Sequence, residues 1–157
     1  MSAKLSGQCS CGGVTYEITG EPLFVQACHC TDCQRTTGSA FVVHIVIPES
    51  ELRIRGRTTM SIAPTGSGQG CELHYCTTCA VFVWVRYLYH QVRAIAVRAG
   101  TLNDTNAVAP QAHIFVRSKQ EWVLIPPDIP TFEGAADRSV IWPPESIARY
   151  DALPERT

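Results

Sequence analysis

The sequence contains no long hydrophobic run, and this absence narrows the classes of protein to which it can belong. No apolar stretch approaches the roughly 18 residues that a transmembrane helix needs. The first residues, 1–8, also lack the apolar segment of a secretory signal. We therefore expect no membrane partner and a cytoplasmic location, where thiols stay reduced.

The sequence also lacks an excess of charge of either sign. Lys and Arg number 13 against 14 Asp and Glu, so the net charge is −1. Without a broad basic field, the chain is not expected to bind nucleic acid. A hydrophobic fraction of 45% and a charged fraction of 17% are ordinary for a globular protein, and 157 residues suffice for one domain with a core.

Cysteine is the residue that this sequence has in excess. Seven of its eight cysteines fall into three tight groups. The groups are Cys9 with Cys11, Cys28 with Cys30 and Cys33, and Cys76 with Cys79. An even number of cysteines would also suit a disulfide framework, but the missing signal segment and the short spacings favour metal binding.

Metal geometry divides the seven clustered thiols into four and three. A CxxC turn brings two sulfurs to one ion, and residues i and i+2 of a strand point to the same face. The simplest partition keeps the contiguous triple together, which gives one closed site and one open site. The closed, structural site would consist of Cys9, Cys11, Cys76 and Cys79, and the open, catalytic site of Cys28, Cys30 and Cys33.

Two alternatives to this partition stay open at the level of sequence. Cys71 could close the triple as a fourth ligand, which would make both sites structural. Iron–sulfur ligation also uses four cysteines, although these spacings match none of its usual runs. Because thiolates prefer zinc to hard cations, two zinc ions are the expected cofactors.

An open site with three thiolates suggests a sulfur substrate. A zinc ion so held carries a net charge of about −1 and is a weaker Lewis acid than one held by three neutral histidines. A thiol is a natural fourth ligand for this ion and is deprotonated when bound. We therefore expect the partner to be a small thiol.

The hydrophobic pattern predicts a mainly β fold. Short runs rich in Val, Ile and aromatic residues alternate with Gly, Pro and Asn turns, as in all-β domains. The tail contains one candidate helix, 144–150, with proline at its start. The expected strands are 14–18, 23–28, 41–47, 52–56, 58–62, 81–85, 92–98, 112–116 and 122–125.

The chain changes character near its end, where prolines accumulate from Pro126 onwards. We expect residues 1–134 to form one zinc-binding domain and residues 135–157 to form a proline-rich extension packed on it. The apolar segment 141–144 could cover a second copy of the chain, so a homo-oligomer is a possible assembly.

Four motifs occur in a specific order. They are Gly7-x-Cys9-x-Cys11-Gly12-Gly13, Cys28-His29-Cys30-x-x-Cys33, Cys76-x-x-Cys79 and Ala99-Gly100-Thr101-Leu102-x-Asp104. In this order they resemble the glutathione-dependent formaldehyde-activating enzyme family, also called S-(hydroxymethyl)glutathione synthase and similar to centromere-protein-V-type domains. The resemblance covers residues 7–134 and is more specific for the family than for one activity.

The resemblance implies a fold, two metal sites and an activity. The fold is a zinc-stabilised β-tent of packed antiparallel sheets, and the metal sites match the partition argued above. The activity is that of a carbon–sulfur lyase, which condenses glutathione with formaldehyde to S-hydroxymethylglutathione or acts on another thiol–aldehyde adduct. A zinc-stabilised binding module without catalysis is the alternative. One residue departs from the family pattern, because Ala80 follows the second CxxC where relatives usually have glycine.

Several other side chains are candidates with a weaker claim. His44 and His113 could transfer protons, whereas His29 is expected to be a packed histidine. Asp32 and Arg35 could contact a tripeptide, although solvated turn charges are the simpler interpretation. Three aromatic residues are expected in the core or at an interface rather than along a substrate, namely Trp84, Tyr87 and Tyr89.

Overall fold

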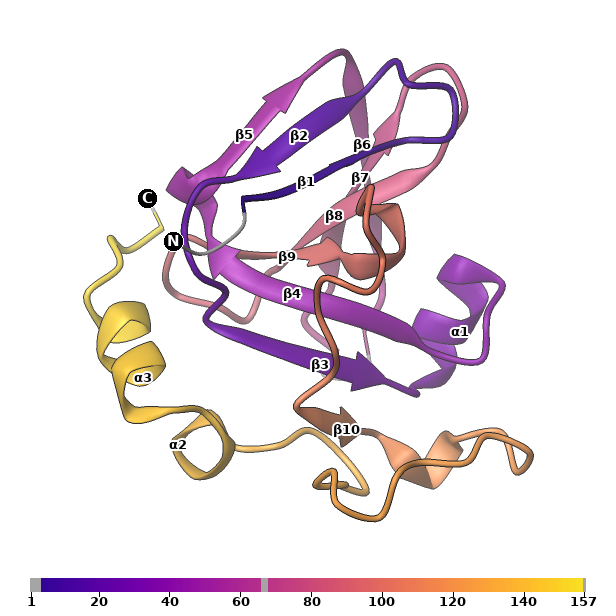
Figure 1. The fold of residues 1–157 in the computed structure, drawn as a ribbon, viewed down its shortest axis with the longest axis vertical. Helices are drawn as coiled ribbons and strands as arrows, with labels where there is room; N and C mark the ends of the chain where they lie inside the picture. The colour runs from indigo at the N-terminus through magenta and orange to yellow at the C-terminus, as the bar shows by residue number, and fades with distance from the viewer. Residues whose placement is uncertain (1–3, 66–67, 157) are drawn as a thin grey trace.

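The computed structural model describes residues 4–65 and 68–156. Its strands form two sheets, which lean against each other over a shared core (Figure 1). The smaller sheet is antiparallel in the order β1-β2-β5, and the larger has the order β10-β3-β4-β9-β8-β7-β6. The strands are β1 (Leu5–Gln8), β2 (Thr15–Ile18), β3 (Phe24–Cys28), β4 (Val42–Pro48), β5 (Leu52–Arg55), β6 (Thr58–Ala63), β7 (Cys71–Cys76), β8 (Phe82–Tyr87), β9 (Ala94–Arg98) and β10 (Ala112–Ile114).

The expected mainly β fold of packed sheets is confirmed. One detail differs, since β10 pairs with β3 in parallel while the other pairings of the larger sheet are antiparallel. Six short helical segments complete the described part of the chain. They are α1 (Thr31–Thr37), η1 (Glu49–Glu51), η2 (Ala99–Thr101), η3 (Val116–Ser118), α2 (Arg138–Ile141) and α3 (Pro144–Asp151).

Strand β4 shows how the sequence places the core and the site on opposite faces of the larger sheet. Side chains alternate along a strand, so Ile45 and Ile47 point to one face and His44 and Val46 to the other. Ile45 and Ile47 are fully buried against residues of β2 such as Ile18, in the core between the two sheets. Val46 belongs to a second buried cluster on the far face, and His44 lines a cavity there.

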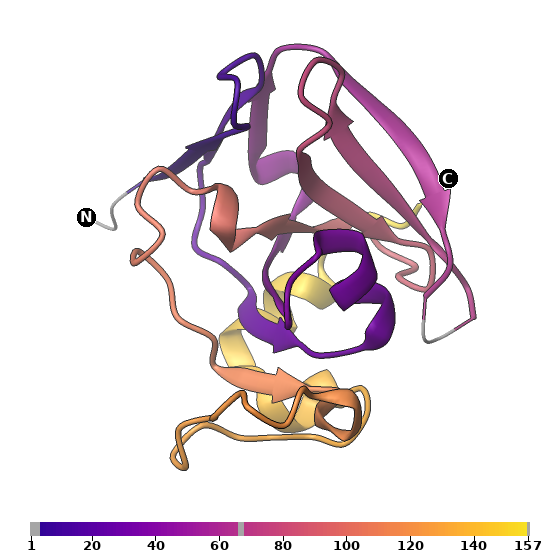
Figure 2. The same ribbon diagram turned by 90° about the vertical axis from the view of Figure 1, so that its right-hand side faces the viewer.

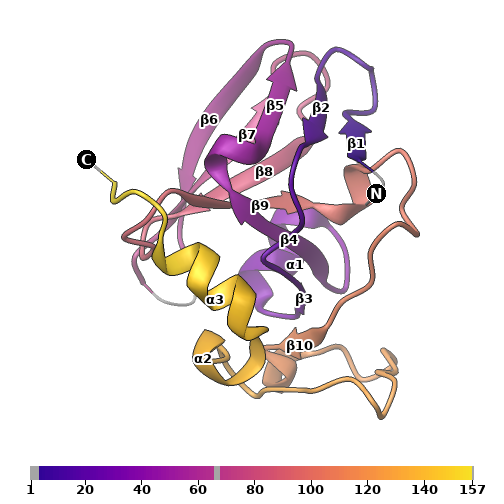
Figure 3. The same cartoon turned by 60° about the vertical axis from the view of Figure 1, so that its left-hand side comes forward.

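The C-terminal segment covers part of that far face, as Figure 3 shows for α2 and α3. Trp142 stacks on Phe24 of β3 with ring centroids 5.7 Å apart, and its edge meets Tyr150 of α3. The hydroxyl of Tyr150 lies 2.5 Å from Nδ1 of His90. Burial of one such aromatic side chain contributes about 3 kcal/mol, so this segment is held to the domain by its own apolar anchors.

Two expectations about local structure are wrong, and one helix was missed. Residues 122–125 form no strand and pair with no described strand, and the side chain of Leu124 is 90% exposed. The strand expected over residues 112–116 ends at Ile114, where Phe115 adopts a left-handed φ of 56° and η3 begins. Helix α1 was not predicted, since it spans only seven residues and buries none of them. The predicted helix over residues 144–150 is present as α3.

None of the helices among the described residues has the length and apolar character that a membrane crossing requires.

Candidate metal centres and cavity

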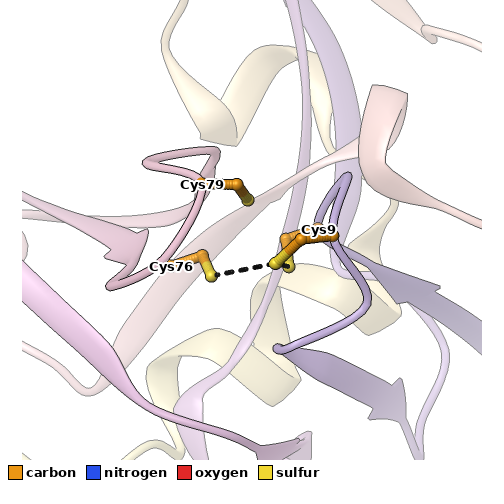
Figure 4. A group of neighbouring side chains, drawn as sticks. Cys9, Cys76 and Cys79 are labelled. Atoms are coloured by element: carbon orange, nitrogen blue, oxygen red, sulfur yellow. Dashed lines mark hydrogen bonds between the residues drawn. The ribbon is translucent and has the colours of Figure 1, made fainter.

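Four cysteines from two distant turns converge on one point. Figure 4 shows Cys9 facing Cys76 and Cys79 from the turn that follows β1. Together with Cys11 they form a group in which all four sulfur atoms lie within 4.8 Å of one another. The Sγ of Cys11 lies 3.5 Å from that of Cys9 and 3.7 Å from that of Cys76. These are the thiols that the sequence argument brings together in the closed site.

Backbone amides point at the sulfur atoms of this group. The N–H of Val14 donates to Sγ of Cys9 at 3.2 Å, that of Gly13 to Cys11 at 3.4 Å, and that of Thr78 to Cys76 at 3.4 Å. Such donors favour the thiolate form, which is the form that binds metal. Four converging sulfurs with these donors fit a tetrahedral zinc ion. Cys9 and Cys11 lie in a turn after β1, so the turn, and not strand alternation, brings them together.

The turn after the second CxxC keeps a left-handed backbone although it lacks glycine. Ala80 has a φ of 56°, and its N–H donates to the carbonyl oxygen of Cys76 at 3.0 Å. Alanine at this position therefore adopts the left-handed turn at the cost of strain. In this region a Cβ costs roughly 1–2 kcal/mol.

Ala80→Gly is accordingly expected to stabilise the folded protein. Relief of strain exceeds the roughly 0.5–1 kcal/mol of chain entropy that an added glycine costs, so the free energy of unfolding should rise by about 0.5–1 kcal/mol. Chemical denaturation of the zinc-loaded protein measures this change. Ala107→Gly, at an exposed turn position whose φ is not positive, is the matched control and should lower the same free energy. An Ala80→Gly protein no more stable than the original would contradict the strain argument.

The second group is the contiguous triple, which lies where β3 meets α1. Cys28 ends the strand, Cys30 caps the helix, and Cys33 stands in its first turn. Sγ of Cys30 accepts a hydrogen bond from the N–H of Cys33 at 3.3 Å. The three sulfur atoms lie within 4.8 Å of one another. The sequence argument placed Cys30 by strand alternation. In the structure it is placed instead by its position as the N-cap of α1.

The thiols of the triple interact strongly with one another. Hydrogen bonds from Cys28 and Cys33 lower the pKa of Cys30 to about 2, while the bond to Cys30 raises the pKa of Cys28 to about 12. The same two neighbours raise the pKa of Cys33. Cys30 therefore ionises first, and a cation at this point favours ionisation of all three. A soft donor set of this kind fits zinc, with one tetrahedral position left for another ligand.

The triple opens into a cavity of about 350 Å³. The cavity lies on the face of the larger sheet that α1 flanks, which Figure 2 brings to the front. Its wall also includes Ala135 and Ala136 from the segment before α2. Besides the three thiols, the polar side chains along it include Gln26, Asp32, His44, Cys71, Tyr87 and Tyr89.

His44 and Tyr87 form a polar pair beside the triple. Nε2 of His44 lies 3.1 Å from the hydroxyl of Tyr87 and 3.9 Å from Sγ of Cys33. Burial lowers the pKa of His44 to about 4, with Arg98 adding to the effect, so the imidazole is neutral at pH 7. Burial, together with the neighbouring thiols of Cys33 and Cys28, raises the pKa of Tyr87 well above its ordinary value. The phenol therefore keeps its proton.

Cys71 faces the same cavity without belonging to the triple. It is buried at the start of β7, and burial raises its pKa to about 11, with Asp32 and Cys30 adding to the effect. Its sulfur lies outside the group of three whose ligand atoms are within 4.8 Å of one another. In this geometry the triple keeps an open position.

The remaining sequence candidates divide between core and cavity. His29 and His113 are buried and joined at 2.8 Å between Nε2 and Nδ1, so both are packed residues away from the cavity wall. Asp32 lines the cavity, whereas Arg35 is exposed and does not. Trp84 is a core residue, as expected.

Tyr87 and Tyr89 line the cavity, a position that the sequence interpretation did not assign to them, and Tyr87 also packs against the buried cluster on the same face. Two signals in the sequence point to this wall. His44 is a lone polar residue within the apolar run 41–47, and Tyr87 follows Val85 at the two-residue spacing of one strand face. Val85, Tyr87 and His44 all line the cavity.

Comparison with known proteins places these features in a family. Residues 4–118 match the profile of the glutathione-dependent formaldehyde-activating enzymes. The chain belongs to this family. A Halomonas elongata protein, named as a candidate enzyme of the family, is 25% identical over 154 residues, which cover 94% of each chain. A Rhodobacter sphaeroides protein of known crystal structure shares 24% sequence identity with this chain. The two structures align with a TM-score of 0.46, over 67% of this chain and 91% of that one.

The family match and the cavity do not coincide completely. Both cysteine groups lie within residues 4–118, but Ala135 and Ala136 of the cavity wall lie beyond them. The C-terminal segment of this chain thus contributes to a site that the family profile only partly covers.

Proposed function

We propose that the chain is a zinc-dependent carbon–sulfur lyase, which forms and cleaves the bond between a thiol and an aldehyde. Glutathione and formaldehyde, giving S-hydroxymethylglutathione, are the reference pair that the family name supplies. The observation that carries the proposal is the open triple of thiols at the wall of a cavity. We also propose a reducing location such as the cytoplasm, because both groups need free thiols.

Each cysteine group has its own role in this proposal. Cys9, Cys11, Cys76 and Cys79 hold a structural zinc ion that joins the turn after β1 to the turn after β7. Cys28, Cys30 and Cys33 hold a second zinc ion at the cavity. When bound there, zinc offers a position at which a thiol is deprotonated at neutral pH.

The reaction needs a proton at the aldehyde oxygen. The thiolate sulfur adds to the carbonyl carbon, a carbon–sulfur bond forms, and the π electrons of the carbonyl move to its oxygen. That oxygen takes a proton, which the thiol has lost in the same overall process. Binding of both reactants in the cavity would align them and convert the addition into an effectively intramolecular step.

The His44–Tyr87 pair is suited to donate a hydrogen bond to the aldehyde oxygen as negative charge develops on it, while the proton itself is the one that the thiol has released. Nδ1 of His44 is buried without a partner among the described residues, and a buried N–H without a partner is costlier than a bare ring nitrogen. We therefore assign the proton of His44 to Nε2, which donates to the oxygen of Tyr87. The hydroxyl hydrogen of Tyr87 is then free to point at the aldehyde oxygen in the cavity.

Removal of the Tyr87 hydroxyl is expected to slow catalysis without unfolding the protein. Loss of one such donor typically costs about 10²-fold in kcat, so Tyr87→Phe should lower kcat by about that factor. Tyr89→Phe removes a hydroxyl from the same wall and should change kcat by less than about threefold. Equal effects of the two substitutions on kcat would show that the Tyr87 hydroxyl has no specific part in the reaction.

The proposed function is tested by the rate at which glutathione and formaldehyde exchange with their adduct, followed by NMR exchange spectroscopy. Zinc-loaded protein should accelerate the exchange over the spontaneous rate, and Cys33→Ala should abolish the acceleration. With both zinc sites filled and no acceleration for this pair or any other thiol, the enzymatic proposal fails and a zinc-held binding module takes its place.

A further inference from the structure

The cavity beside the triple has almost no charged wall. Among the described residues that line it there is no Lys or Arg, and Asp32 is the one carboxylate. Its neutral wall is largely aliphatic and aromatic. The largest of these side chains are Leu73, Phe82, Tyr87, Tyr89, Ile114 and Phe115.

Two neighbouring arginines, Arg98 and Arg138, are engaged outside the cavity. Arg98 donates to the carbonyl oxygen of Phe82 at 3.2 Å and stacks on that ring. Arg138 lies 3.6 Å from Asp151 and over the ring of Tyr150. Neither arginine is among the residues that line the cavity.

This wall conflicts with the charge of glutathione. The tripeptide carries two carboxylates and one ammonium group besides its thiol. A zinc ion with three thiolates already has a net charge of about −1, and a fourth thiolate makes the centre more negative still. Carboxylates placed beside this centre and Asp32 would lose water without gaining a cationic partner, which is unfavourable.

We infer that the cavity selects a thiol, or its aldehyde adduct, that carries no carboxylate and has an apolar or aromatic substituent. This inference rests on the proposed function, because it names the thiol for the same site. The aliphatic and aromatic wall would pack against the substituent, while the sulfur reaches the triple. An uncharged or cationic thiol avoids the repulsion that glutathione meets.

A panel of thiols tests the selection. The rate of adduct exchange with formaldehyde is measured for glutathione, glutathione diethyl ester and benzyl thiol, each divided by its own spontaneous rate. The ester has the same backbone as glutathione with both carboxylates masked. We expect kcat/KM, normalised in this way, to be at least about tenfold higher for the ester and for benzyl thiol than for glutathione.

One substitution probes the same repulsion from the protein side. Asp32→Asn removes the negative charge from the cavity wall and should reduce the ester-to-glutathione ratio by about threefold or more. Asp128→Asn makes the same change in net charge at an exposed turn outside the cavity and should leave that ratio unchanged. An identical ratio in both variants would show that the cavity charge does not select the thiol.

Binding by calorimetry separates the failure of this inference from that of the proposed function. If glutathione is turned over as well as its ester, the enzymatic proposal stands and the inference is overturned. If no thiol is turned over, the enzymatic proposal fails, and titration of the zinc-loaded protein decides the selection. Tighter binding of the ester than of glutathione then supports the inference, and equal or weaker binding overturns it.

Discussion

Replacement of Cys76 by serine is expected to unfold the protein at ordinary temperatures. Cys76 is buried, and its sulfur lies among those of the closed group, which joins segments 65 residues apart. Structural zinc contributes about 10–16 kcal/mol of binding free energy in small zinc domains, which is comparable to the roughly 5–15 kcal/mol by which a whole domain is stable. Loss of one of four ligands therefore removes so much of the stabilising free energy that packing of the two sheets cannot compensate for it.

Strand β7 supplies a matched control for this experiment, since it begins with Cys71 and ends with Cys76, and both are buried. Cys71→Ser should keep two zinc ions per chain and lose only about 1–3 kcal/mol through burial of the new hydroxyl. Zinc content by mass spectrometry under native conditions and thermal melting by circular dichroism measure both proteins. If Cys76→Ser melted at the same temperature as Cys71→Ser, the closed group would have no structural role.

The second large effect is expected at the triple and concerns activity, with the fold retained. Cys33→Ala leaves two thiols of the triple, too few to hold zinc firmly, so the zinc content should fall from two to one per chain. Turnover should fall to the spontaneous rate, because no group remains to hold the thiol in its deprotonated form. The melting temperature should change by a few degrees at most, since α1 buries none of its residues and the closed group is intact.

Cobalt substitution gives this prediction a readout that does not depend on turnover. The original protein should bind two cobalt ions and show intense thiolate-to-metal absorption from both groups, whereas Cys33→Ala should bind one and lose part of that absorption. Addition of a thiol should change the spectrum of the original protein and leave that of Cys33→Ala unchanged. A full complement of two metals in Cys33→Ala would place the second ion elsewhere.

The cysteine groups could be predicted from sequence because their chemistry is local. Two thiols separated by one or two residues can converge whatever the rest of the chain does, and the odd number of clustered thiols leaves three for the second group. The mainly β fold was also accessible, because runs such as 41–47 carry a strong β pattern.

The cavity could not be predicted in the same way, because its wall is assembled from distant strands. Tyr87 comes from β8 and Phe115 from the segment after β10, and only the strand order of the larger sheet brings them to the triple. The failure at residues 122–125 has the opposite cause. The local pattern there favours a strand, but no neighbour pairs with it, and Trp122 is left 72% exposed.

The parallel pairing of β10 with β3 has a consequence for synthesis on the ribosome. The thiols of residues 28–33 emerge early, yet the wall that encloses them is complete only when residue 136 has left the exit tunnel. A strand pair so far apart in the sequence forms late, because the long intervening loop must close first. The nascent chain therefore exposes these three thiols for most of translation. Protection of these thiols from oxidation depends on early metal capture or on the reducing power of the surroundings.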